Sequence, residues 1–493
     1  MLAQIEQCLH DALQVLKVEG VIPQDISPLI RVQRTPDAVF GDLTTNLALL
    51  LSEACDVAAR DIAQRLVDAI LLQPSALEVD IAGPGFINFY LDQELRCAIV
   101  AQILEQGEQF GSSKFGAGKS VQAGFFAATS AAPLHVGQGR VVALGASIGN
   151  MLEAVGFNVS RNYLACEADS TENLIDDDLA RLGTLYYHYS SALCIAERAT
   201  AIIRQLEQTG HTFVRDGATW LDSSNHSGDN EPVLIYANGE ATELAIYSTY
   251  IHEMLCRGFD TVLDLVNADQ HGYVAPAQAL CSALGSVPGS VPDTECKKLQ
   301  ALRVQPVTVC RSLEPAPQSS RLVSQVELFK LYEAVGKDAA RFFYVTRSYS
   351  RHLEFDPDLA TNWSCDNPVY SVQFAYARIC SLKRQLRQCG TGFDPVSGLA
   401  AISRLTATTE TELMMRLAIY PEIVQRAALA YEPYQLTRYL RDLANGLHTY
   451  YSSKKVLVDD HSLRQARLCL LLAVQQVLKN GLVIIGVSAP EVM

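Results

Sequence analysis

The chain has 493 residues, 49% of them hydrophobic and 19% charged, so it can bury several cores, and about three domains are expected from its length. No apolar run approaches the roughly 20 residues that span a bilayer, and the first 20 residues are amphipathic instead of basic and apolar. Thirteen cysteines without Cys-x-x-Cys pairs favour reduced thiols over a disulfide framework or a zinc site. We therefore expect a cytoplasmic protein with no membrane partner and no metal ligands.

The charge is unevenly distributed along the chain. A formal net charge of −15 and a pI of about 5.2, taken alone, argue against a nucleic-acid partner. Residues 366–493, however, contain 14 Lys and Arg against 10 Asp and Glu, a net charge of +4, which leaves −19 on residues 1–365. A polyanionic ligand is therefore better tolerated at the C-terminal end.

The first segment, residues 1–112, combines helical and strand-like patterns. Apolar residues recur with helical spacing at 2–18, 47–55 and 58–72. Alternating apolar residues at 79–81 and 86–91 flank a Gly- and Pro-containing turn and predict two connected strands. These patterns predict a small α+β domain.

The second segment, residues 120–350, follows a Gly- and Ser-rich linker and alternates strand-like with helical stretches, as in a doubly wound α/β fold. Near its start, a strand at 121–127 leads through a turn into a helix that begins near His135. Helix N-termini with His and Gly residues present backbone amides and an imidazole to phosphate groups. A later buried strand at 258–266 ends in the polar cluster 267–273, where such folds bind ligands.

The third segment, residues 366–493, is helical throughout in its apolar spacing. Helices are predicted at 367–388, 409–431, 433–451 and 462–479. An all-α bundle is the fold that these patterns favour.

Three groups of motifs resemble the arginyl-tRNA synthetases, a class I aminoacyl-tRNA synthetase family. They are Gly41-Asp-x-x-Thr-Asn46 with Ala82-Gly-Pro-Gly-Phe-Ile-Asn-Phe89, His135-Val-Gly-Gln138, and Asp366-Asn-Pro-Val-Tyr-Ser-Val-Gln-Phe-Ala-Tyr-Ala-Arg378. The resemblance runs in family order over nearly the whole chain. It implies a tRNA-elbow domain at 1–112, a Rossmann-like catalytic domain at 120–350 and a helical anticodon-binding domain at 366–493. It also implies a monomer that binds tRNA of the tRNA-Arg type and, if active, arginine and ATP with magnesium.

The resemblance places ATP beside five residues and leaves altered catalytic signatures. The ATP-binding positions are His135, Gly137, Asp269, Gln270 and His271, and the signature positions are His135, Gly137, Gln138 and Arg321. The family has a second His at Gln138, and glutamine donates a hydrogen bond but carries no charge. The Lys-Met-Ser-Lys-Arg positions fall on Pro317–Arg321, where both lysines are missing, and 129–134 holds no replacement. A charge supplied by Arg321 is the alternative.

The arginine pocket also departs from the family pattern. Its positions are Cys166, Glu167, Glu243 and Ser248. By resemblance, Glu243 replaces an aromatic wall and Ser248 replaces the acidic partner of the guanidinium. Losing a charge-assisted contact removes the main reason for an arginine side chain to choose this pocket. Each lost transition-state donor typically costs about 3–4 kcal/mol.

The resemblance assigns tRNA contacts to both ends of the chain. They are Asn46, Phe86, Tyr370, Gln373, Tyr376, Arg378, Tyr451, Lys454 and Lys455. Aromatic residues interleaved with polar and basic ones suit unstacked loop nucleotides. The ordinary alternatives are a helix cap at Asn46, a core position for Phe86 and core packing of the helical tyrosines. Three basic residues at 383, 384 and 387 could contact phosphates, with a solvated face as the alternative.

The altered nucleotide and arginine sites contrast with a preserved helical domain. Our leading hypothesis is a tRNA-binding chain that has lost arginine activation. The first alternative is a working arginine–tRNA ligase with a diverged site. The second is a site repurposed for another cationic small molecule, which Glu167 and Glu243 would favour.

Overall fold

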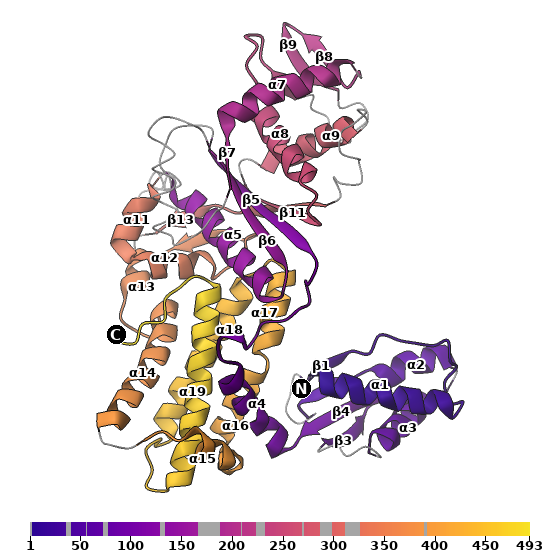
Figure 1. Ribbon diagram of the computed structural model, residues 1–493, viewed down its shortest axis with the longest axis vertical. Helices are drawn as coiled ribbons and strands as arrows, with labels where there is room; N and C mark the ends of the chain where they lie inside the picture. The colour runs from indigo at the N-terminus through magenta and orange to yellow at the C-terminus, as the bar shows by residue number, and fades with distance from the viewer. Residues whose placement is uncertain are drawn as a thin grey trace. The chain divides into compact units, whose positions relative to one another are not determined.

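The computed structural model describes residues 2–35, 41–55, 57–71, 77–128, 134–165, 188–208, 210–222, 232–268, 271–285, 298–310, 326–388 and 392–493. The chain forms two compact units, each assembled from separate stretches of sequence. The first unit comprises residues 1–107, 392–418 and 449–474, and the second comprises residues 108–391, 419–448 and 475–493. Figure 1 shows the elements of both units. This division crosses the predicted helical domain, and the predicted domain boundaries stay predictions.

The N-terminal part of the first unit is a four-stranded antiparallel sheet with three helices packed against it (Figure 1). The strands are β1 (Val32–Arg34), β2 (Leu43–Thr45), β3 (Leu77–Ala82) and β4 (Phe86–Leu91), in the order β1-β2-β4-β3. The helices are α1 (Leu2–Val18), α2 (Leu47–Cys55) and α3 (Ala59–Leu71). In α3, Ile62, Leu66 and Ile70 recur every four residues and are fully buried. The predicted α+β domain is confirmed.

Three further helices and parts of two others contribute to the first unit. The whole helices are α4 (Gln93–Gln106), α15 (Pro395–Ala400) and α16 (Thr408–Ala418), and the parts belong to α18 (Tyr434–Ser453) and α19 (His461–Ile484). Asp92 caps α4 by accepting a 2.7 Å hydrogen bond from the amide of Leu95. Gln93 donates a 2.5 Å hydrogen bond to the carbonyl of Leu405. The first turn of α4 is therefore tied to the segment that precedes α16.

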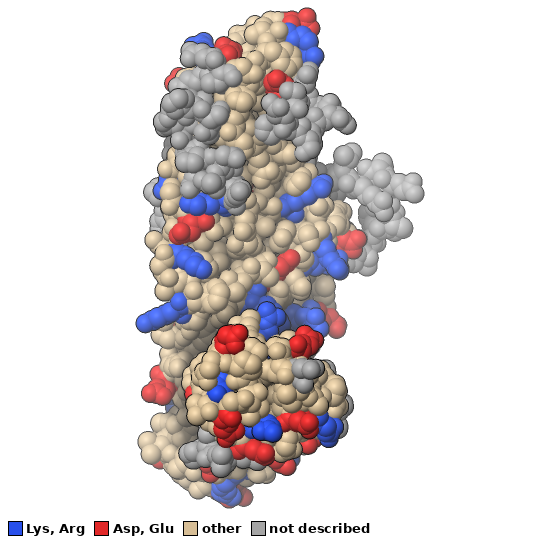
Figure 2. All heavy atoms as spheres, turned by 90° about the vertical axis from the view of Figure 1, so that its right-hand side faces the viewer, with Lys and Arg blue, Asp and Glu red and all other residues tan. Residues whose placement is uncertain are grey.

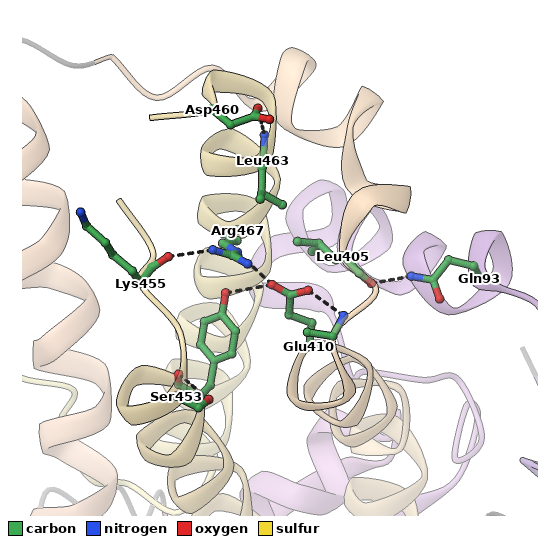
Figure 3. A network of polar contacts seen from close by, with 10 residues as sticks. Gln93, Leu405, Glu410, Ser453, Lys455, Asp460, Leu463 and Arg467 are labelled. Atoms are coloured by element: carbon green, nitrogen blue, oxygen red, sulfur yellow. Dashed lines mark hydrogen bonds and ion pairs between the residues drawn. The ribbon is translucent and has the colours of Figure 1, made fainter. Parts of the chain in front are cut away.

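A buried ion pair joins α16, α18 and α19 in the first unit (Figure 3). The Glu410 carboxylate, 1% exposed as a residue, accepts hydrogen bonds from Arg467 Nε at 2.9 Å and Tyr450 Oη at 3.4 Å. Its other oxygen accepts from the Ala407 amide at 3.1 Å. Arg467 also donates to the carbonyl of Lys455 at 2.7 Å. Both charges therefore have partners, as burial requires.

The second unit contains a five-stranded parallel sheet. Its strands are β5 (Ser120–Ala128), β6 (Asn158–Ala165), β7 (His188–Ser191), β11 (Thr261–Asn267) and β12 (Leu299–Val304), in the order β12-β11-β5-β6-β7. The chain moves outward from β5 through β6 to β7 and then returns to β11 on the other side of β5. The order therefore reverses between β5 and β11, as in a doubly wound fold. The predicted α/β fold is confirmed.

Helices and two small sheets complete the α/β part of the second unit (Figure 1). The helices are α5 (Val136–Ala154), α7 (Ala192–Gln208), α8 (Glu243–Cys256), α9 (Val274–Gly285), α11 (Leu328–Val335), α12 (Lys337–Tyr344) and α13 (Pro357–Thr361). The small sheets are an antiparallel one of β8 (Thr212–Arg215), β9 (Ala218–Leu221) and β10 (Val233–Ile235), and a parallel pair of β13 (Val307–Val309) and β14 (Leu353–Phe355). Helix α5 contacts three strands of the main sheet and is almost entirely buried.

The C-terminal segment is helical, as predicted, with one correction. Residues 409–431 form two helices instead of one, because α16 ends at Ala418 and α17 (Tyr420–Leu429) begins two residues later. Pro421 stands in the first turn of α17, the part of a helix that tolerates a residue without an amide hydrogen. The first predicted helix corresponds to α14 (Pro368–Gln388).

Helix α19 is more apolar than the sequence analysis expected. Among the described residues it alone is long and apolar enough, by length and composition, to cross a membrane. In its most apolar window, 67% is buried inside the structure, which is the pattern of a core helix. Its apolar character therefore serves packing.

On the face drawn in Figure 2, basic and acidic side chains of the described residues are interspersed among uncharged ones.

Candidate nucleotide and tRNA sites

The predicted nucleotide residues flank the point where the order of the parallel sheet reverses. Strand β5 ends at Ala128 and is followed by α5, and its neighbour β11 ends at Asn267. Ligands of doubly wound folds bind beyond the carboxyl ends of the strands at this point. The structure therefore brings the regions of His135 and Asn267 to one end of the sheet. Asp269 and Gln270, which follow Asn267, lie outside the described residues.

The side chains of His135 and Gln138 cap the start of α5. His135 is the N-cap residue, and its Nδ1 accepts hydrogen bonds from the amides of Gly137 at 3.1 Å and Gln138 at 3.4 Å. The Gln138 Oε1 accepts in return from the His135 amide at 3.0 Å, which completes a capping box. Gln138 is 7% exposed. Both signature side chains therefore stabilise the helix start.

Two backbone hydrogen bonds connect the start of α5 to residues 326–328. The amide of Val136 donates to the carbonyl of Val326 at 3.0 Å, and the amide of Leu328 donates to the carbonyl of Leu134 at 2.8 Å. The second signature positions, 317–321 with Arg321, precede Val326 in the chain and lie outside the described residues. Together with the bonds to the His135 ring, these contacts give each of the first three amides of α5 a protein partner.

The predicted arginine-pocket positions lie in different surroundings. Cys166 and Glu167 lie outside the described residues. Glu243 is exposed at the first position of α8 and accepts a 3.2 Å hydrogen bond from the Tyr273 hydroxyl. Ser248 is fully buried, and its hydroxyl donates to the carbonyl of Leu244 at 2.7 Å within the same helix. The Ser248 hydroxyl is therefore engaged by its own backbone.

A buried carboxyl group in β11 escaped the sequence analysis. Asp264 is fully buried, and the Tyr247 hydroxyl on α8 donates a 2.5 Å hydrogen bond to it. Burial raises the pKa of Asp264 to about 7, and the hydrogen bond from Tyr247 opposes that rise. The signal was a single acidic residue in the otherwise apolar stretch 262–266. Asp264 is therefore a buried titratable group on β11, the strand next to the sheet edge formed by β12.

Arg140 on α5 also escaped the sequence analysis. Its guanidinium is fully buried and donates to the carbonyls of Gln305 at 2.7 Å, Arg351 at 2.9 Å and Ser348 at 2.9 Å. Burial lowers the pKa of Arg140 to about 10, so the group stays protonated at neutral pH. Arg140 thereby fixes the segment after α12 to the helix that carries the signature.

The two N-terminal tRNA positions lie together on the surface. Thr45 on β2 pairs with Ile87 on β4, and this antiparallel register places the next residue, Asn46, across from Phe86. Both side chains are exposed, Phe86 to 39%. The core position considered for Phe86 is therefore wrong. The carbonyl of Asn46 accepts the amide of Leu50, so Asn46 also begins α2.

Helix α14 presents a ladder of aromatic rings. Tyr370 stacks on Phe374 with ring centroids 5.5 Å apart, and Phe374 stacks on His448 at 5.8 Å. Trp363, 76% exposed, lies 6.2 Å from Tyr370. A cleft of about 620 Å³ runs beside this ladder, with Trp363, Tyr370 and Gln373 in its lining. An exposed ring at the edge of a cleft suits stacking on an unpaired base.

The other predicted residues of α14 have more structural surroundings. The Gln373 amide donates to the Asp338 carboxylate at 2.9 Å and to the carbonyl of Ser488 at 3.0 Å. Tyr376 is 8% exposed, and burial raises its pKa to about 12. Arg378 is half-buried. Gln373 therefore holds the C-terminal tail against α12 and leaves base contacts to its neighbours.

The predicted contacts at the end of α18 lie in the first unit, Tyr451 in the last turn of the helix and Lys454 and Lys455 in the loop that follows. Tyr451 and Lys454 are half-buried, and Lys455 is exposed. Arg467 bonds the Lys455 carbonyl, and Arg464 donates to the carbonyl of Val458 at 2.7 Å. The backbone carrying both lysines is therefore held in one position.

These features define a class of protein. A doubly wound sheet with a His-Gly helix start beside its reversal point, followed by a helical C-terminal segment, is the architecture of a class I aminoacyl-tRNA synthetase. Residues 3–91 match the arginyl tRNA synthetase N terminal domain, and residues 372–493 match the DALR anticodon binding domain.

Full-length relatives specify the family. The arginine–tRNA ligase of Thioalkalivibrio sulfidiphilus is 34% identical over 591 aligned positions, which cover 99% of this chain and 100% of the relative. That of Legionella pneumophila strain Corby is 34% identical over 594 positions, with both chains fully covered. The chain belongs to the arginyl-tRNA synthetase family, and the resemblance found in its motifs is confirmed.

Solved structures support the fold. The arginyl-tRNA synthetase of Thermus thermophilus superposes with a TM-score of 0.74 at 19% identity over the whole of both chains. That of Plasmodium falciparum gives 0.71 at 14% identity and covers 100% of this chain and 99% of its own. At these identities the likeness shows the fold alone.

Proposed function

We propose that this chain binds tRNA of the tRNA-Arg type through its helical C-terminal domain and has lost ATP-dependent arginine activation. The loss of activation is supported by the start of α5, where the backbone amides are already hydrogen-bonded. The amides of Val136, Gly137 and Gln138 have protein partners, so this helix N-terminus offers a phosphate no unoccupied amide at those positions. The donors that an ATP phosphate would need there are engaged, and we route no catalytic step through ATP.

The tRNA-binding part is supported by α14 and its surroundings. The exposed Trp363 and the half-buried Tyr370 line a cleft of about 620 Å³. Each base that stacks on such a ring contributes about 1–3 kcal/mol. The matched anticodon binding domain, residues 372–493, covers most of this helix. The net charge of +4 on residues 366–493 lowers the cost of bringing a polyanion there.

Transition-state energetics support the loss of activation. By the family resemblance three elements of the site are weakened, namely Gln138 in place of a second histidine, the missing lysines at 317–321 and Ser248 in place of an acid. One lost donor costs about 3–4 kcal/mol, or 10²–10³ in rate. Two such losses lower the rate on the order of 10⁴-fold, even with non-additivity. The Ser248 hydroxyl is buried and bonded to Leu244, so it does not supply the negative charge of the acid that it replaces.

The length of the chain points the same way. The relatives align over 591 to 594 positions, whereas this chain has 493 residues, so about a hundred positions of each relative have no counterpart here. A synthetase that keeps its substrates ordered needs its positioning residues, and shortened segments remove them.

A working ligase is the second candidate, and one observation favours it. The relatives that are 34% identical over their full length are named as arginine–tRNA ligases. In this case His135, Gln138, Asp269, His271 and Arg321 would form the diverged site, with ATP and magnesium as cofactors. ATP binding would then require the capping box of α5 to open.

Arginine-dependent exchange of labelled pyrophosphate into ATP distinguishes the two candidates. The purified chain is assayed with and without a tRNA-Arg transcript, beside the Legionella pneumophila ligase as a positive control. We expect exchange at background level together with saturable binding of the transcript in a filter-binding assay. Exchange within tenfold of the control overturns the loss of activation, and absent tRNA binding overturns the binding function.

A further inference from the structure

A basic pocket lies between α14 and α19 in the second unit. Its volume is about 250 Å³, and four cationic side chains line it, namely Lys383, Arg384, Arg387 and Lys479. One carboxylate, that of Glu491, also lines it. Cations therefore outnumber acids here, although the whole chain carries a net charge of −15. A local excess of positive charge concentrates anions at that place.

Two of these cations are available to bind an anion. Lys383 is half-buried and Arg387 is exposed, and neither makes a hydrogen bond or ion pair with another described residue. Lys479 pairs with Glu108 at 2.7 Å, with both side chains substantially exposed. Exposed pairs of this kind contribute little, so an incoming anion can replace Glu108.

The floor of the pocket is uncharged. Burial raises the pKa of Tyr376 to about 12, and burial followed by the nearby Glu491 raises the pKa of Cys380. Both groups are therefore neutral at physiological pH and do not repel an anion. The Gln475 amide, 7% exposed, lies 2.8 Å from Cys380 and adds a polar group to the same floor. Uncharged polar groups thus line the pocket together with the cations.

The spacing of the cations fits a chain of phosphates better than a single ion. Lys383 and Arg387 are four residues apart on α14, which corresponds to about 6 Å along the helix axis. Each strand of a nucleic-acid duplex carries one charge about every 3.4 Å along its axis. The separation of the two residues corresponds to nearly two of these steps, so their side chains can contact different phosphates of one strand, whereas a lone phosphate ion engages only part of the set.

We propose that this pocket binds backbone phosphates of the tRNA, which extends the proposed tRNA-binding function to a second surface and rests on it. Glu491 occupies the rim as an internal counter-charge. Arg384 donates to the carbonyl of Glu491 at 3.2 Å and so keeps this tail residue beside the pocket. The Glu491 carboxylate lines the same pocket and repels an incoming phosphate, so removal of its charge strengthens RNA binding.

Salt-dependent tRNA binding tests the proposal with the full-length chain. The double variant Lys383→Ala/Arg387→Ala removes two phosphate contacts, so the slope of log K against log salt falls by about 1.5 and affinity drops on the order of tenfold at low salt. The control Arg438→Ala/Arg441→Ala removes the same charge from exposed positions on α18 and is expected to keep the slope. Glu491→Gln is expected to bind the transcript two- to threefold more tightly.

Three outcomes overturn the proposal. An unchanged slope in the pocket variant excludes phosphate contacts at this site, and an equal loss in the control attributes the effect to net charge. If inorganic phosphate or pyrophosphate protects the chain against heat through Lys383 and Arg387 while tRNA affinity stays unchanged, the site binds a small free anion. If the unaltered chain binds no tRNA, the proposed function itself fails, which is a distinguishable result.

Discussion

Removing the Glu410 carboxylate should weaken one part of the first unit far more than an ordinary surface change. In Glu410→Ala, Arg467 keeps its hydrogen bond to the Lys455 carbonyl but loses its counter-charge at a side chain only 11% exposed. Breaking a buried pair costs about 3–5 kcal/mol, and the amide of Ala407 also loses its acceptor. The remaining bond to Lys455 offsets part of this, so we expect a loss of about 3–4 kcal/mol.

Hydrogen exchange followed by mass spectrometry measures this loss where it occurs. At 1.4 kcal/mol per factor of ten, amides of α16 and α19 should lose protection by two to three orders of magnitude. Amides of α5, which belongs to the second unit, serve as the internal reference. The control Arg404→Ala breaks an ion pair with Asp460 in which both side chains are 45% exposed, so a loss below about 1 kcal/mol is expected.

A double-mutant cycle supplies the refutation. The cycle compares Glu410→Gln and Arg467→Met alone with the two combined. In the double variant both charges disappear together, so it should be more stable than the sum of these two single losses predicts, by about 2 kcal/mol or more. Strictly additive losses would show that the two side chains do not depend on each other, and the buried-pair reasoning would be wrong.

Three further predictions concern other parts of the chain. The pKa of Asp264 is 3.8 in the unfolded chain and about 7 when buried, so the folded state binds the proton more tightly and the free energy of unfolding should fall by up to about 4 kcal/mol as pH rises from 4 to 7. Urea unfolding at pH 4.5, 6 and 7.5 measures this fall, and Asp264→Asn should flatten it. A pH profile of the variant parallel to that of the unaltered chain would contradict the prediction. His135→Ala should cost about 1 kcal/mol in thermal unfolding through loss of the α5 cap while tRNA affinity stays unchanged; a more than threefold weaker binding would assign His135 a role beyond capping. Phe86→Ala should weaken transcript binding by about 1–3 kcal/mol with stability altered by less than about 0.5 kcal/mol, because the ring is exposed; a large stability loss with unchanged binding would restore a structural role.

The fold could be predicted from the sequence because its signals are local. Helix α1 begins and ends at the predicted residues, and the strand-turn-strand at 77–91 follows from alternation around a Gly-Pro turn. The break between α16 and α17 was missed even though Pro421 is visible in the sequence. An apolar period continues through such a break, and a proline in the first turn of a helix does not interrupt it.

The surroundings of the candidate site could not be predicted because they depend on residues distant in the chain. Gln373 was interpreted as a base contact, yet its amide reaches Asp338 and Ser488, which are 35 and 115 residues away. Ser248 was compared with an acidic pocket residue, and only its burial in the helix shows that the hydroxyl bonds Leu244. Spacing identifies which residues share a motif, but tertiary contacts decide which of their atoms stay available.

The parallel sheet has a consequence for synthesis of the chain on the ribosome. Strand β5 pairs with β11, and the amide of Ser120 donates to the carboxylate of Asp260, 140 residues later. At about 5–20 residues per second, roughly 7–30 s pass between translation of these two residues. During that interval one edge of β5 has no partner strand, and unpaired apolar edges associate with other chains. Nascent chains halted between residues 165 and 260 should therefore be the most prone to aggregate and to recruit chaperones.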